Sequence, residues 1–211
     1  SRNVNILALR GKLSVDRAER ALGKKLSSIP LGDGGILSSR VFKPSPIKKY
    51  RLGIIAHMSE KNHDIFKNIN NQIENSVIID IFDTPDKFIR KLTECETIIS
   101  TALHPLIVAD IYNIPNMWVN LSKDANISMY KFSDYYSAFN QEAEYFDLTR
   151  KEFQEKDIDN LIKNYKITCQ QVTDIQNDLI AAHPYSNNIE FITKPQIIYL
   201  NSRRLMKRLY K

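Results

Sequence analysis

The segment from Cys95 to Val119, CETIISTALHPLIVADIYNIPNMWV, constrains the fold of this chain more than any other. Thr97-Ile98-Ile99 is a short β-branched run, typical of a parallel strand buried on both faces. The residues from Leu106 to Tyr112 continue as an apolar helix, and Asn113-Ile114-Pro115 ends that helix before a second strand at Met117-Trp118-Val119. A strand, a helix and a strand in succession predict one βαβ unit of a parallel sheet.

The same alternation extends through most of the chain. Strands are expected at 50–57, 77–82, 98–99 and 117–119, with helices at about 62–74 and from 84 onward. Residues 140–182 read as polar and helical, and we expect them to fold back across the domain. The fold class predicted is therefore α/β, a Rossmann-like parallel sheet with flanking helices.

Composition shifts suggest four parts. Residues 1–43 are expected to be the end of an N-terminal part, with a strand at 4–9, a helix opening at Ser14 and a glycine-rich turn at 32–35. Residues 44–49, within the KPSPIKK run, read as a linker. Residues 50–193 would form the Rossmann-like domain, and residues 194–211 a basic C-terminal tail.

The bulk composition, 43% hydrophobic and 26% charged, is that of an ordinary soluble globular protein. No apolar run approaches the ~20 residues that span a bilayer, and no secretory signal is visible at the start of the chain. The two cysteines, Cys95 and Cys169, and the four histidines form no metal-ligand spacing, so neither a disulfide framework nor a metal site is expected. These features predict a cytoplasmic protein.

The formal net charge of +6 comes from the tail at 194–211, which holds six basic residues and no acid. Leu205, Met206, Leu209 and Tyr210 stand among these cations at near-helical spacing. One interpretation is a tail that rests on an anionic membrane; the other is a solvated end. Nucleic-acid binding has no supporting motif.

A candidate site lies where the strand at 97–99 meets the following helix. In doubly wound α/β sheets, anionic ligands bind where the carboxyl end of a strand meets a helix N-terminus. Ser100 and Thr101 can cap that helix or donate hydroxyls to a phosphate, and His104 stands near its positive end. A histidine there could donate to an anion or exchange a proton.

Five ordered motifs carry a resemblance: LALRGKLS, PLGDGGILSSR, KKYRLGIIAHM, ISTALHPLIVADIYNIPNMWV and KFSDYYSAF. Together they resemble the polysaccharide pyruvyl transferase family of bacterial surface-polysaccharide and capsule assembly, mainly its C-terminal half. The resemblance implies a fold like one half of a GT-B-type transferase. It also implies transfer of pyruvate from phosphoenolpyruvate, a co-substrate, to two hydroxyls of a sugar as a ketal, with no cofactor. The acceptor would be an oligosaccharide or lipid-linked sugar at the inner face of the membrane, and residues 50–193 would bind the donor.

The resemblance also points to individual residues. His104 follows the strand as the second residue of a Leu-His pair, and Arg10 ends an early strand where the family has a donor-pocket arginine; both would be catalytic. His57 stands where the family often has Pro-His, preceded here by Ala56. Ser100, Thr101, Lys131 and Asp134 complete the predicted substrate-binding set, with the last two at the rim.

Two positions depart from the family pattern. Ala102 replaces an arginine common two residues before the motif histidine, and Pro105 replaces a glycine, which removes an N–H. An N-terminal domain with an Asn-Phe-Gly-Asp-type motif is expected in the family and not seen, so we expect a fragment with little activity alone. Two alternatives stay open: a GT-B glycosyltransferase using a nucleotide sugar, and a degenerate scaffold subunit of a polysaccharide assembly complex.

Overall fold

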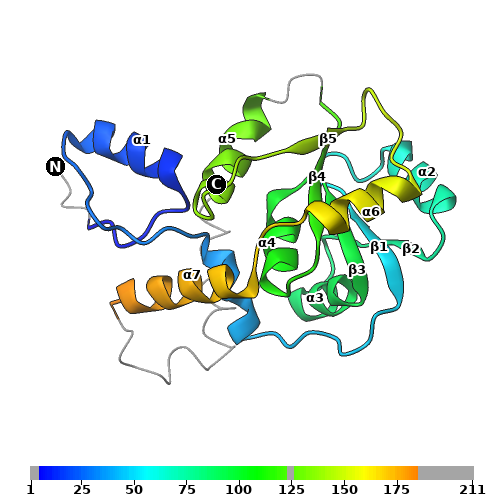
Figure 1. Ribbon diagram of the computed structural model, residues 1–211, viewed down its shortest axis with the longest axis horizontal. Coiled ribbons are helices and arrows are strands. Elements are labelled where there is room, and N and C mark those ends of the chain that lie inside the picture. Colours follow the sequence, from blue (N-terminus) through cyan, green and yellow to red (C-terminus); the bar gives the residue numbers. More distant parts are fainter. Residues whose placement is uncertain (1–4, 123–125, 185–211) are drawn as a thin grey trace.

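The fold is built on one five-stranded sheet. In the computed structural model, which describes residues 5–122 and 126–184, all strands are parallel and their order is β2-β1-β3-β4-β5 (Figure 1). The strands are β1 (Tyr50–Ile55), β2 (Ser76–Ile78), β3 (Cys95–Ser100), β4 (Asn116–Asn120) and β5 (Tyr145–Asp147). This arrangement confirms the predicted Rossmann-like α/β class.

Helices cover both faces of the sheet. They are α1 (Lys12–Leu22), the 3₁₀ helix η1 (Gly34–Arg40), α2 (Asp64–Gln72), α3 (Pro85–Thr93), α4 (Leu103–Ile111), α5 (Asn126–Ser137), α6 (Glu155–Asn164) and α7 (Cys169–Ala182). The core of one face includes apolar side chains from η1, α3, α4, α5 and α7, whereas the other face packs α2 and α6. Ile98 belongs to the first core and its neighbour Ile99 to the second, which explains why this strand is apolar without alternation.

The N-terminal part differs from the expectation. In place of a strand at 4–9, the described residues form one isolated parallel bridge, Leu9 to Leu31, and residues 1–4 lie outside the described part. Leu9 N–H donates to the Pro30 carbonyl, and Gly32 N–H donates to the Leu9 carbonyl. The helix that follows is α1, which Gly23 ends in the left-handed conformation at φ 64°.

The interpretation of residues 140–182 as wholly helical is wrong at one place. This segment contains α6 and α7, and it also contains β5. β5 is a three-residue edge strand whose register is Trp118 opposite Tyr145 and Asn120 opposite Asp147. A strand of three residues is too short to show an alternation of polar and apolar residues. Its position is set by pairing with the neighbouring strand β4.

The expected linker at 44–49 is irregular and is held against the domain. Ser45 N–H donates to Thr93 Oγ1 at 2.8 Å, and Lys49 N–H donates to the Glu94 carbonyl at 2.7 Å. Ile36, ahead of this segment, is fully buried in the same core as α4 and α5. The division into parts stays a prediction, and the basic tail at 194–211 lies outside the described residues. In the described part of the chain, no helix is long and apolar enough to cross a membrane.

Candidate functional site

The strand order places a topological switch point between β1 and β3. These two strands are neighbours, yet the helix after β1 (α2) packs on one face of the sheet and the helix after β3 (α4) packs on the other. The connections therefore diverge at the carboxyl ends of β1 and β3, which is where parallel α/β sheets bind ligands. His57 follows β1, and the Ser100–His104 segment follows β3, so these predicted residues lie at that edge.

Ser100 and Thr101 tie the ends of β1 and β3 together. The Ser100 hydroxyl donates to the Ile55 carbonyl at 2.8 Å and accepts from Ala102 N–H at 3.0 Å. Thr101 Oγ1 accepts from His57 N–H at 2.8 Å. Helix α4 is capped by neither side chain, because its N-cap is Ala102, without a side-chain hydrogen bond. The expected capping role is thus wrong, and both hydroxyls instead fix the backbone that carries the two histidines.

His104 is exposed in the first turn of α4. The glycine-rich turn at 32–35 lies beside it, because a Cβ added at Gly35 would lie 3.9 Å from His104 Cδ2. Asp33 Oδ1 accepts from Gly35 N–H at 2.9 Å and holds this turn. The imidazole is therefore accessible at the positive end of a helix, next to a segment more than sixty residues earlier in the chain.

Pro105 follows His104 and is buried in the first turn of α4. A proline there does not weaken the helix, since first-turn N–H groups have no partner within the helix. It does remove one of the N–H groups that could face an anion. The N-terminus of α4 offers Leu103 and His104 as backbone donors, so an anion bound here needs side-chain cations as well.

Arg10 is positioned by a buried carboxylate. Its Nε donates to Asp134 Oδ2 at 2.9 Å, and the side chain of Asp134 is fully buried whereas that of Arg10 is 28% exposed. Ser14 completes the arrangement, because its N–H and its hydroxyl donate to Asp134 at 2.8 Å and 2.5 Å. The ion pair uses Nε, which leaves the two terminal amino groups of the guanidinium for a ligand. Asp134 thus holds Arg10 and does not line a rim.

Lys131 lies one helical turn before Asp134 on α5. Burial lowers the pKa of the Lys131 ammonium; the Glu60 carboxylate opposes this, and the positive charge of Arg10 adds to it. Glu60 Oε2 is itself buried without a hydrogen-bond partner, and Glu60 N–H donates to the His57 carbonyl at 2.8 Å. Sequence reasoning missed Glu60, because a glutamate in a turn three residues after His57 carries no distinguishing pattern.

One ion pair, one backbone hydrogen bond and the charge effects on Lys131 relate five residues, here called the strand-end cluster: Arg10, His57, Glu60, Lys131 and Asp134. It joins the end of β1 to α5 and to the segment before α1. Ser100, Thr101 and His104 lie at the adjoining end of β3. In the described ranges, no three histidine, cysteine, aspartate or glutamate side chains are grouped to hold a metal ion.

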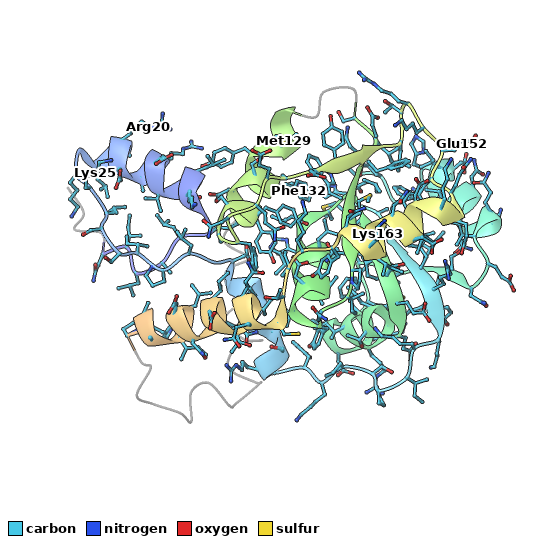
Figure 2. All side chains as sticks on the ribbon, in the orientation of Figure 1. Arg20, Lys25, Met129, Phe132, Glu152 and Lys163 are labelled. Atoms are coloured by element: carbon cyan, nitrogen blue, oxygen red, sulfur yellow. The ribbon has the colours of Figure 1, made fainter. Side chains whose placement is uncertain are left out.

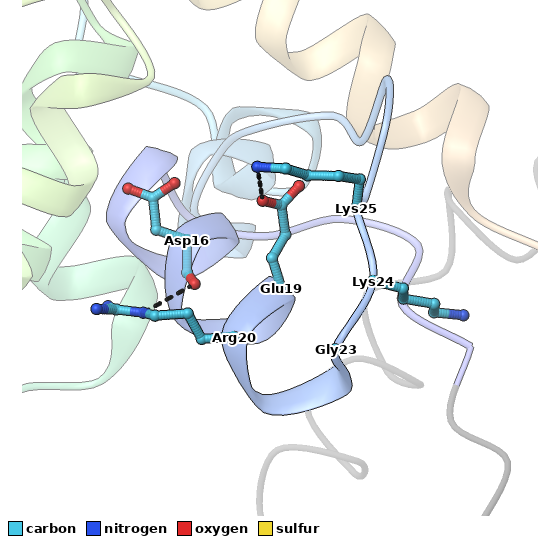
Figure 3. Close-up of a pocket in the computed structure, with 6 residues that line it drawn as sticks. All are labelled: Asp16, Glu19, Arg20, Gly23, Lys24 and Lys25. Atoms are coloured by element: carbon cyan, nitrogen blue, oxygen red, sulfur yellow. Dashed lines mark hydrogen bonds and ion pairs between the residues drawn. The ribbon is translucent and has the colours of Figure 1, made fainter.

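A separate hollow of about 480 Å³ lies at the far end of α1 (Figure 3). Its lining is charged apart from one glycine: Asp16, Glu19, Arg20, Gly23, Lys24 and Lys25. Lys25 Nζ pairs with Glu19 at 2.8 Å, and Arg20 Nε donates to the Asp16 carbonyl at 3.2 Å. None of the predicted site residues contributes to this hollow, so the strand ends remain the better candidate.

The fold defines a Rossmann-like α/β protein that carries His57 and the Ser100–His104 segment at its switch point. The chain belongs to the polysaccharide pyruvyl transferase family, whose model matches residues 1–123. The matched region includes Arg10, His57 and His104, while Lys131 and Asp134 follow it. The resemblance stated from the sequence is therefore confirmed.

One curated relative is the uncharacterized protein L143 of Acanthamoeba polyphaga mimivirus, 31% identical over 134 residues. The aligned region covers 60% of this chain and 46% of the relative, so the chain spans about half the length of that protein. No solved structure matches the chain significantly.

Proposed function

We propose that this chain binds phosphoenolpyruvate at the strand ends and supplies the donor side of a pyruvyl transferase. The complete reaction would move pyruvate to two hydroxyls of a sugar as a ketal. Membership of the family supports a transferase acting on a polysaccharide. The observation that carries the donor assignment is the ion pair by which buried Asp134 holds Arg10, with Lys131 one helical turn away from Asp134 on α5.

Phosphoenolpyruvate suits this arrangement because it carries both a phosphate and a carboxylate. The guanidinium of Arg10 is held by Asp134 with its terminal amino groups free, which favours a two-pronged contact with one anionic group. The ammonium of Lys131 is half-buried and is repelled by Arg10. An anion placed between them would relieve that repulsion, and the N-terminus of α4 would add further positive potential.

The proposed chemistry needs proton transfer and charge stabilisation. Protonation of the methylene carbon of phosphoenolpyruvate leaves an oxocarbenium-like centre at the adjacent carbon, which one sugar hydroxyl attacks. The bond from that carbon to the phosphate oxygen then breaks, and the second hydroxyl closes the ketal as phosphate leaves. His104, an exposed imidazole in the first turn of α4, is the proposed acid and base.

The remaining assignments follow from this proposal. The acceptor would be an oligosaccharide or a lipid-linked sugar, and the reaction would take place in the cytoplasm at the inner face of the membrane. No cofactor besides the co-substrate is required by the chemistry. Ser100 and Thr101 would act through the backbone that they hold, and His57 would contact the ligand from the end of β1.

Thermal unfolding with and without phosphoenolpyruvate tests the donor site. The ligand should raise the Tm of the wild-type chain, and this rise should be lost in His104→Ala and Arg10→Ala. His63→Asn, which keeps an N-cap acceptor on α2, and Arg17→Ala, an exposed residue of α1, are the matched controls and should keep the full rise.

Equal protection of all variants would remove this site from consideration. Protection by UDP- or CMP-sugars with none by phosphoenolpyruvate would favour the nucleotide-sugar glycosyltransferase. Lack of response to either donor class would favour the scaffold alternative, which Ala102 and the buried Pro105 suggest.

A further inference from the structure

We propose that the chain has a second ligand site, for a neutral saccharide, at the amino-terminal end of the sheet. The site is a cavity of about 520 Å³, within the ~300–1,000 Å³ range of small-molecule sites. It is formed by residues 116–118 at the start of β4, by the end of α5 and its connection to β5, and by α6 and its connection to α7. The strand-end cluster lies at the opposite end of these strands, so the two sites are distinct.

Five amide side chains line the cavity. They come from all three segments: Asn116, Asn140, Gln141, Asn160 and Asn164. An amide both donates and accepts hydrogen bonds, which matches a sugar hydroxyl that does the same. Asn160 is exposed and Gln141 is half-buried, so their amides can reach a ligand. The cavity therefore offers the mixed donor and acceptor groups that a polyhydroxylated ligand needs.

The charges of the lining favour a neutral ligand over a phosphorylated one. Glu142 and Glu144 stand against a single cation, Lys166, so the lining carries a net negative charge. The half-buried rings of Tyr136 and Tyr165 add apolar surface on which the C–H face of a sugar can pack. A neutral saccharide satisfies the amides, the carboxylates and the rings together, whereas phosphoenolpyruvate or a nucleotide would be repelled.

A buried carboxylate holds two of the residues that line this cavity. Asp110, which is 1% exposed, accepts hydrogen bonds from Asn116 Nδ2 at 2.5 Å and from the Tyr165 hydroxyl at 2.8 Å. Trp118 stacks on Phe132, labelled in Figure 2, with ring centroids 3.9 Å apart and an interplanar angle of 5°. Lining residues from separate segments are thus held before any ligand arrives, which lowers the entropic cost of binding.

One step of this proposal rests on the proposed function. If the chain acts in pyruvyl transfer, the cavity would hold a part of the saccharide acceptor away from the end that is modified. A polymer offers repeated units, and two sites on one chain raise the effective concentration of the second unit. Binding itself does not depend on that context and can be measured without the donor.

Trp118 provides a direct probe, because it is the single tryptophan of the chain and lines the cavity. We expect lactose or cellobiose to change its fluorescence saturably, with saturation-transfer difference NMR as a second readout, and glucose 6-phosphate to give neither signal. Gln141→Ala and Asn160→Ala should each weaken binding at least fivefold. Asn71→Ala, an exposed amide on α2, should bind as the wild type does.

The saccharide proposal is overturned if neither disaccharide binds by either readout, if the two cavity variants bind as tightly as Asn71→Ala, or if His104→Ala abolishes binding. A preference for glucose 6-phosphate also overturns it. Failure of phosphoenolpyruvate protection with retained disaccharide binding would count against the donor site alone, so the two proposals fail separately.

Discussion

At the scale of single residues, Asp110 shows how burial and hydrogen bonding compete. Its carboxylate is buried, and burial raises its pKa to about 6 although Asn116, Tyr135 and Tyr165 all donate to it and favour the charged form. The three donors come from β4, α5 and the segment after α6. Asp110 therefore joins these elements at the cost of keeping an ionisable group in the core.

This balance predicts a pH dependence of stability. Because folding raises the pKa of Asp110, the folded state favours the protonated carboxyl. Its contribution to the free energy of unfolding is fully present below about pH 4 and is lost as pH rises through about 6. Relative to Asp110→Asn, the wild-type free energy of unfolding should fall by on the order of 3 kcal/mol between pH 4 and 7. Urea unfolding followed by Trp118 fluorescence measures it, and a difference that does not vary with pH would contradict it.

At the scale of elements, the contact between α1 and α5 decides where Arg10 lies. Gly11 is the N-cap of α1, and a Cβ added there would lie 1.6 Å from the Asp134 carbonyl oxygen. Lys12 N–H also donates to Ser137 Oγ at 2.8 Å. The two helices thus meet backbone to backbone. The glycine after Arg10 is required because the backbones approach closely; its conformation does not require it, since a φ of −164° suits any residue.

Gly11→Ala should accordingly force α1 away from α5 and destabilise the fold by roughly 3 kcal/mol, the upper range for overpacking. Gly34→Ala is the matched control, because a Cβ there meets nothing within 4 Å. Chemical unfolding of both variants compares them directly. A Gly11→Ala variant as stable as Gly34→Ala would show that the two backbones separate easily.

At the scale of the whole molecule, the N-terminal segment shares a core with the sheet. Ile36 of η1 is fully buried with Leu106 and Ile107 of α4, and Gln176 of α7 donates to the Ile36 carbonyl at 2.7 Å. Segments on both sides of the predicted linker at 44–49 therefore contribute to one packed layer. This argues that residues 5–43 and the sheet unfold together.

Ile36→Ala should lower the free energy of unfolding by about 2–5 kcal/mol, as for other large-to-small changes in cores. Circular dichroism at helical wavelengths and Trp118 fluorescence should shift together, since one transition is expected. Ile47→Ala, at an exposed position of the linker, should leave both unchanged. Two separated transitions would instead support independent folding of the N-terminal part.

Local chemistry made much of this protein predictable. The β-branched run of β3, the apolar α4 and the stop at Asn113-Ile114-Pro115 are short-range patterns, and they predicted the parallel sheet and the place of His104 correctly. Family membership was likewise readable from ordered motifs. By contrast, β5 and Glu60 were missed, because a three-residue edge strand and a lone turn glutamate have no periodicity.

The sequence alone therefore determined the alternation of strands and helices, since the spacing of hydrophobic residues that favours a helix or a strand involves residues close together in the chain. The tertiary structure decided which charges meet. Arg10 and Asp134 are 124 residues apart, and they pair because α1 packs on α5. Such a contact depends on how whole elements pack, which no local pattern of residues encodes.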